Sequence, residues 1–160
     1  MDWIEADHWA EVAEADWRWA NFSPHELACR GTGQLKVHVR SLDRLQQLRD
    51  RLGAPMIITS AYRSPMHNAR VGGARRSMHL LGRAFDVSMA NHDPRAFEAA
   101  AREVGFTGFG FYPSQGFMHI DTRGWSITWG TPFQPRGKEK RFARETPHGV
   151  EAGEREDLAA

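Results

Sequence analysis

Several features common in other classes of protein are scarce in this sequence of 160 residues. Its one cysteine, Cys29, excludes an intramolecular disulfide and a zinc site built from several thiolates. No segment approaches the roughly 18 apolar residues that a membrane span needs, so no stable membrane insertion is expected. Basic and acidic side chains number 21 and 20, and without an excess of positive charge no nucleic-acid partner is expected.

The first residues also lack the pattern of a secretory signal. The segment 1–7 is acidic and interrupted by charges, whereas a signal combines a basic region with an apolar one. We therefore expect synthesis in the cytoplasm. The length predicts a single domain, which we expect to be a monomer.

Both ends of the chain differ in composition from its middle. Residues 1–21 hold four of the six tryptophans, and the helical spacing of Trp9 and Trp17 predicts a Trp-rich helical arm docked on the domain. Contact of this arm with the cell wall or a membrane is the alternative interpretation. Residues 134–160 contain six basic and six acidic side chains among few large apolar ones, which predicts a charged, flexible tail.

Helix and strand signals fill residues 22–133, where we expect the domain. Capping residues predict helices that begin after Ser23, Ser64 and Asp93, and regularly spaced leucines predict a helix that stops at Gly53. Short apolar or alternating runs predict strands at 56–60, 84–89, 108–112, 117–121 and, at an edge, 125–129. The order of elements favours an α+β fold, with N-terminal helices packed on a small, mainly antiparallel sheet.

Histidine and aspartate recur on two of these predicted strands. Asp86 lies on the polar face of one strand, and His119 and Asp121 share a face of another. His79 precedes Asp86 by seven residues, across a glycine turn. Two imidazoles and one carboxylate, with a fourth position left to water, match a catalytic zinc site. By spacing alone, a hydrogen-bonded core histidine and a turn-adjacent carboxylate are the alternative.

Three segments carry a resemblance to a known family. They are Thr-Ser-Ala-Tyr-Arg-Ser-Pro-Met-His-Asn at 59–68, Val-Gly-Gly-Ala at 71–74, and Ser-x-His-x-x-Gly-x-Ala-x-Asp at 77–86. With the later His119-Ile120-Asp121 they resemble the zinc D-Ala-D-Ala carboxypeptidase family, and most closely its branch of phage endolysins and small peptidoglycan peptidases. That family lies in the lysostaphin, D-Ala-D-Ala peptidase and hedgehog-like superfamily, so the resemblance implies a hedgehog/D-Ala-D-Ala peptidase-like fold for residues 22–133.

The resemblance also implies roles for individual residues. His79, Asp86 and His119 would bind one zinc ion, and Arg63 of the Tyr-Arg-Ser motif would stabilise the oxyanion of the tetrahedral intermediate. Ser77 would lie beside the metal as a hydrogen-bonding group for substrate, with a plain turn serine as the alternative. The implied substrate is a peptidoglycan stem peptide.

The general base is the point at which this sequence departs from several relatives. They place an acid three residues before the last zinc histidine, where this chain has Gly116. We expect Asp121 to be the base, because it lies two residues beyond His119 on the same strand face. The alternative is that Asp121 orients a ligand or pairs with Arg123. Tyr112, on the neighbouring predicted strand, is a weaker candidate for contact with substrate or oxyanion.

The function expected from these residues is zinc-dependent hydrolysis of a stem-peptide or cross-link bond, by a D,D-carboxypeptidase or an endopeptidase. The expected setting is a phage or prophage endolysin, made in the cytoplasm and released to the cell wall by a separate holin. The alternative is a non-catalytic, zinc-containing module that binds cell-wall peptide. Arg63 and Asp121 argue against this alternative, because a purely structural zinc site needs neither group.

Overall fold

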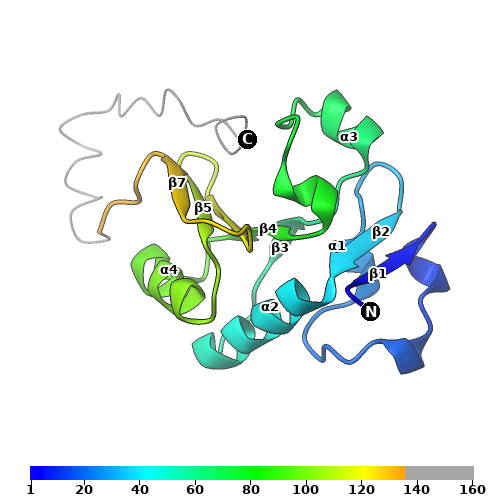
Figure 1. Cartoon of the computed structure of the whole chain (residues 1–160). Helices are drawn as coiled ribbons and strands as arrows, with labels where there is room; N and C mark the ends of the chain where they lie inside the picture. The colour runs from blue at the N-terminus through cyan, green and yellow to red at the C-terminus, as the bar shows by residue number, and fades with distance from the viewer. Residues whose placement is uncertain (136–160) are drawn as a thin grey trace.

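Two β-sheets of different size organise the chain in the computed structural model, which describes residues 1–135 (Figure 1). The smaller sheet pairs β1 (Trp3–Ala6) with β2 (Leu35–His38) in antiparallel fashion. The larger sheet has the strand order β3-β4-β6-β5-β7. Its members are β3 (Ile58–Ser60), β4 (Ala84–Ser88), β5 (Gly108–Tyr112), β6 (Phe117–Asp121) and β7 (Ile127–Gly130).

The central strands of the larger sheet have two chemically different faces. Residues Phe85, Val87, Met118 and Ile120 belong to the apolar core, so one face of β4 and β6 is buried against it. The alternate positions place Asp86 and the acidic and imidazole groups of β6 on the opposite face. Alternation along each strand therefore separates the core from the polar site.

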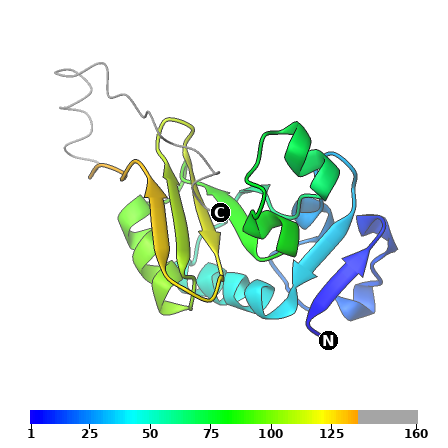
Figure 2. The same ribbon diagram turned by 45° about the horizontal axis from the view of Figure 1, so that its top comes forward.

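Helices α2 (Val39–Leu52) and α4 (Pro94–Glu103) cover the apolar face of the sheet. They contact each other, and Figure 2 shows them side by side. Both contribute buried side chains to the same core cluster, namely Leu42, Leu45, Leu48, Phe97 and Ala101. Two shorter helices, α1 (Pro24–Leu27) and α3 (Pro65–Arg70), begin after capping serines, as the sequence predicts. The α+β fold class is confirmed, and the parallel pairing of β5 with β7 makes the sheet mixed.

The predicted N-terminal helix is wrong. Residues 1–20 contain strand β1 and two single turns of 3₁₀ helix, η1 (Trp9–Glu11) and η2 (Glu14–Asp16). Pairing with β2, which the sequence patterns did not reveal, satisfies the backbone of β1. The indoles of Trp3, Trp17 and Trp19 donate hydrogen bonds to Leu81 O, Phe22 O and the Asp43 carboxylate. These three tryptophans thus dock on the rest of the described chain.

Two further observations concern the predicted C-terminal tail and membrane insertion. The predicted tail begins at residue 134, and residues 136–160 lie outside the described residues. No helix within residues 1–135 combines the length and the apolar character that crossing a membrane requires.

Candidate metal centre

A short turn between α3 and β4 brings His79 to the polar face of the sheet. His79 lies in η3 (Met78–Leu81), a 3₁₀ turn that begins at Ser77 and ends at Gly82. Gly82 adopts a left-handed conformation with φ of +66°, and a Cβ at this position would lie 2.4 Å from the carbonyl oxygen of Lys36. Glycine is therefore required at the bend that returns the chain from His79 into β4.

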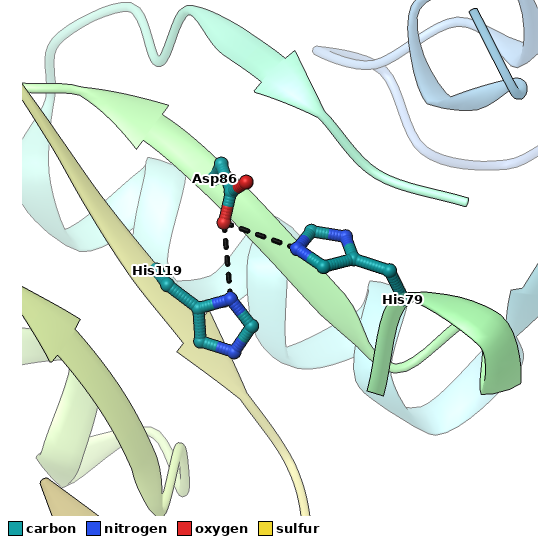
Figure 3. Close-up of side chains that lie close together, drawn as sticks. All are labelled: His79, Asp86 and His119. Atoms are coloured by element: carbon teal, nitrogen blue, oxygen red, sulfur yellow. Dashed lines mark hydrogen bonds and ion pairs between the residues drawn. The ribbon is translucent and has the colours of Figure 1, made fainter. Parts of the chain in front are cut away.

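The pairing of β4 with β6 brings the other two predicted ligands together. Asp86 is directly opposite His119 in the antiparallel ladder, so both side chains project from the same face. Asp86 Oδ1 lies 3.1 Å from His79 Nε2 and 3.0 Å from His119 Nδ1 (Figure 3). Each of the three residues offers a ligand atom within 4.8 Å of the others, and all three are buried. The structure thus assembles the three predicted ligands from η3, β4 and β6.

The outer nitrogen of each histidine faces a hydrogen-bond acceptor. His79 Nδ1 lies 2.5 Å from the carbonyl oxygen of Ala61, and His119 Nε2 lies 2.7 Å from Asp121 Oδ2. In the neutral rings, an N–H at each outer position would leave the lone pairs of His79 Nε2 and His119 Nδ1 available to a metal ion. This arrangement fixes the tautomers that metal binding needs. Two imidazole nitrogens and one carboxylate oxygen form a donor set that fits zinc.

The buried charges explain the protonation of the metal-free centre. Burial opposes ionisation of Asp86, but His79 and His119 outweigh it and hold the pKa of Asp86 well below its usual range. Burial alone would lower the pKa of His119, whereas its hydrogen bonds to Asp121 and Asp86 raise this pKa to about 9. Without metal, the His119 ring is therefore protonated on both nitrogens and donates to Asp86 and Asp121, and the proton on Nδ1 would have to leave before that nitrogen could bind zinc.

Arg63 lies directly beside this cluster. Its Nη2 is 3.4 Å from Asp86 Oδ2, the second oxygen of the carboxylate whose Oδ1 lies near both histidines. Its Nε donates to Ser60 Oγ at 3.2 Å, and its Nη1 donates to Asn68 Oδ1 at 3.3 Å. Because only 8% of Arg63 is exposed, these contacts hold a permanent positive charge in one orientation next to the metal ligands.

Asp121 contacts the far edge of the His119 ring, away from Asp86. Its Oδ1 accepts hydrogen bonds from Arg123 N at 3.1 Å and Arg123 Nε at 2.9 Å. Its Oδ2 accepts from Arg123 Nη2 at 2.6 Å, in addition to the bond with His119. Burial would raise the pKa of Asp121, but the bonds from His119 and Arg123 keep it well below its usual range. Of the two roles that the sequence leaves open for Asp121, these contacts favour orientation of His119.

Strand β5 makes room for this arrangement with two glycines. A Cβ on Gly108 would lie 2.2 Å from Asp121 Oδ1, and a Cβ on Gly110 would lie 2.5 Å from the indole of Trp129. The Trp129 ring in turn packs against His119, with 4.9 Å between the ring centroids. Gly108, Gly110 and Trp129 were not predicted from the sequence as part of the site. The signal was the alternation of glycine in β5, on the face that it shares with His119.

The two predicted substrate-binding residues have hydrogen-bond partners within the fold. Ser77 is buried, and its Oγ accepts a hydrogen bond from His79 N at 3.2 Å. The Tyr112 hydroxyl accepts a hydrogen bond from Trp129 Nε1 at 2.7 Å, and its ring stacks on Phe117. Ser77 therefore supports a metal ligand directly, whereas Tyr112 reaches the centre through Trp129. Contact of either residue with substrate stays a prediction.

Comparison with known proteins adds a family to this geometry. Residues 20–121 match the family model described as Peptidase M15, which is more than half of the chain. The chain belongs to the peptidase M15 family. The resemblance that the sequence motifs carry is thereby confirmed, and the matched segment contains His79, Asp86, His119 and Arg63.

Two characterised relatives illustrate this membership. The zinc D-Ala-D-Ala carboxypeptidase of Streptomyces albus G is 34% identical over 90 residues, which cover 52% of this chain and 35% of that protein. The peptidoglycan L,D-endopeptidase MepK of Escherichia coli K12 is 33% identical over 87 residues, which cover 50% of this chain and 48% of that protein. The chain thus spans less than half the length of these relatives.

Proposed function

We propose that this protein is a zinc-dependent peptidase that hydrolyses a peptide bond of peptidoglycan. The observation that carries the proposal is the buried His79–Asp86–His119 cluster with the guanidinium of Arg63 beside it. Membership of a peptidase family supports hydrolysis, and the names of both relatives support peptidoglycan as the substrate. The name of the Streptomyces relative supports zinc as the metal.

The three ligands would supply two neutral donors and one negatively charged donor to the ion. His79 Nε2 and His119 Nδ1 supply neutral donors, because Ala61 and Asp121 accept the protons of the opposite ring nitrogens. Asp86 supplies the negative charge. Zinc, when bound, provides a Lewis acid that activates water and polarises a carbonyl group.

Arg63 supplies a positive charge, in addition to that of the metal ion, for stabilising the oxyanion that forms in peptide hydrolysis. Negative charge develops on the carbonyl oxygen as the tetrahedral intermediate forms, and a pre-oriented guanidinium stabilises it. Ser60 and Asn68 hold Arg63 in place before substrate binds, so little reorganisation accompanies the reaction. A metal centre with a purely structural role would gain nothing from a buried arginine at this position, which argues against the binding-module alternative.

The role of Asp121 follows from its hydrogen bonds to His119 and Arg123. Both of its carboxylate oxygens accept hydrogen bonds from Arg123, and one also accepts from His119 on the ring edge opposite the ligand nitrogen. We assign it the positioning of His119. Its role as general base stays a prediction, which the Asp121→Asn variant described in the Discussion tests.

The decisive experiment is digestion of purified peptidoglycan with mass spectrometry of the soluble products. The zinc-loaded protein should release stem-peptide fragments or D-Ala, and His119→Ala should release none. Arg63→Gln should keep one zinc ion and lose roughly 10²- to 10³-fold in turnover, the range typical for removal of one oxyanion donor. Arg95→Gln, at an exposed position of α4, serves as the matched arginine control. If a protein shown to hold zinc cleaved no peptidoglycan, the result would contradict the peptidase function and favour the non-catalytic binding module.

The same digestion experiment identifies the bond that is cut. The two relatives differ in specificity by name, one being a D-Ala-D-Ala carboxypeptidase and the other an L,D-endopeptidase. Loss of a terminal D-Ala assigns a carboxypeptidase, whereas fragments cut within the stem peptide or cross-link assign an endopeptidase.

We also propose that the protein acts on the cell wall as a phage or prophage endolysin that a holin releases. The peptidoglycan relatives support the wall as the place of action. Expression with and without a holin, followed by turbidity of the culture, tests this setting. Lysis should require the holin, and detection of the protein in the periplasm of intact cells without one would contradict the proposal.

A further inference from the structure

An open pocket separate from the metal centre lies between β1 and the start of α2. Its volume is about 550 Å³, and none of the metal ligands lines it. Figures 1 and 2 place the N-terminal strand beside the first turn of α2, and the backbone of Asp2 accepts a hydrogen bond from Val39 N there. Three arginines, Arg40, Arg44 and Arg83, line this pocket.

Within residues 1–135, the three arginines of this pocket lack acidic partners. None of them forms an ion pair with a carboxylate among residues 1–135, whereas Arg18, Arg51, Arg63, Arg102 and Arg123 all do. Of the two acidic residues at the pocket, Asp43 already binds Arg18 and the indole of Trp19. Arg44 donates to the carbonyl oxygen of Gly105, and the Arg83 guanidinium lies 5.5 Å from the centre of the Trp3 ring.

The helix end adds to the positive potential. The first turn of α2 contains no acidic residue, and its N-cap His38 provides no side-chain hydrogen bond to the backbone. Arg40 occupies this first turn, where a positive side chain opposes the helix dipole. Burial lowers the pKa of His38, and the charges of Arg83, Arg40 and Arg44 lower it further against the opposing charge of Asp2. Because these positive charges repel one another and the start of α2, an anion bound between them would stabilise the folded protein.

We propose that this pocket, defined by Arg40, Arg44 and Arg83, binds a phosphate group. Guanidinium groups donate paired hydrogen bonds that match phosphate oxygens, and backbone amides at a helix start favour the same anion. The pocket is larger than one phosphate ion, so a small phosphate monoester also fits the proposal. The site shares no residue with the zinc centre, and its test is independent of peptidase activity.

Thermal unfolding and calorimetry test the site with inorganic phosphate as the probe. Phosphate should raise the Tm of the wild-type protein above its value in chloride at equal ionic strength, since an anion that binds the folded state stabilises it. Arg40→Gln/Arg83→Gln should weaken phosphate binding by at least about tenfold, because two charge-assisted contacts are lost. Arg95→Gln is the matched control, since Arg95 also lies in the first turn of a helix but outside the pocket. An equal Tm increase in the double variant, or none in the wild type, overturns the proposal.

Spectroscopy of the wild-type protein gives a second test that needs no variant. Phosphate should shift the amide signals of Arg40 and Ser41 and the indole signal of Trp3 in a nitrogen–proton spectrum. Shifts confined to the basic residues Arg70, Arg75 and Arg76 would place the anion elsewhere and overturn the assignment. Glycerol 3-phosphate distinguishes the ligand source: equal affinity to inorganic phosphate assigns the free ion, and tighter binding assigns an organic phosphate.

Discussion

Asp121 is a buried carboxylate that accepts hydrogen bonds from two neighbours, His119 and Arg123. In Asp121→Asn the negative charge that fixes the His119 tautomer is lost, and we expect zinc affinity to fall by roughly 10- to 100-fold. Competition of the protein with a chromogenic chelator measures this affinity. Turnover at saturating zinc is measured in parallel.

The matched control for this variant is Asp93→Asn, because Asp93 makes no side-chain cap bond at the start of α4. Its zinc affinity should equal that of the wild-type protein. Full zinc affinity together with lost turnover in Asp121→Asn would contradict the positioning role and assign the general base to Asp121.

Gly108 shows how a residue without a side chain shapes the same site. In Gly108→Ala the added Cβ would lie 2.2 Å from Asp121 Oδ1, so the Asp121 carboxylate must move away from His119 and Arg123. We expect a loss of about 1–3 kcal/mol in the free energy of unfolding, the range for overpacking a filled site, and weaker zinc binding. Urea unfolding of the metal-free protein and zinc titration measure the two effects. Gly124→Ala is the control, because a Cβ there meets no atom within 4 Å.

At the scale of elements, the sequence predicts those parts whose signals are local. The strands predicted at 108–112 and 117–121 have the same bounds as β5 and β6, because period-two alternation and the turn between them lie within a few residues. The His79-to-Asp86 motif is local in the same sense, since one glycine bend joins the ligands. His119 lies on a strand further along the chain, and it was expected beside them because it also occupies the polar face of a strand and because the family resemblance implies a third ligand there.

The N-terminal segment could not be predicted in this way. Strand β1 acquires its partner β2 about thirty residues later, and only this pairing satisfies its backbone. The helical spacing of Trp9 and Trp17 misled, because extended residues separate the two single 3₁₀ turns of this segment, and Trp9 and Trp17 reach His25 and Phe22 without a continuous helix. Tertiary contacts likewise determine that β7 pairs parallel to β5, which no local pattern indicates.

Helix α4 provides a test of the separation between core and site. Phe97 is fully buried in the core cluster beneath the sheet, on the face opposite the metal ligands. Phe97→Ala should cost about 3–5 kcal/mol in the free energy of unfolding, the range for removing a buried phenylalanine. Calorimetric melting measures the loss, and Arg95→Ala on the exposed surface of the same helix is the control. Because the ligands lie on β4, β6 and η3, the folded variant should still bind one zinc ion; loss of stoichiometric zinc binding would contradict this separation.

At the scale of the whole molecule, the metal centre lies where three separate parts of the chain meet. The ligands come from η3, β4 and β6, and the adjacent Trp129 comes from β7, beyond the segment 20–121 that matches the family. Without metal, the hydrogen bond between His119 and Asp86 still links β6 to β4, and Asp121 holds His119 from within β6. We therefore expect the domain to fold without zinc and to gain stability when zinc binds.

Removal of the metal tests this coupling. An ion that binds only the folded chain stabilises it by an amount that grows with the ratio of its concentration to its Kd, about 2.7 kcal/mol at a hundredfold excess over Kd. A chelator should therefore lower the Tm of the zinc-loaded protein while leaving one cooperative transition. His119→Ala removes a ligand, so its Tm should be the same with and without the chelator. A chelator-treated protein that loses its cooperative transition would show that the domain needs zinc to fold. The hydrogen bonds that His119 makes to Asp86 and Asp121 without metal argue for the first outcome.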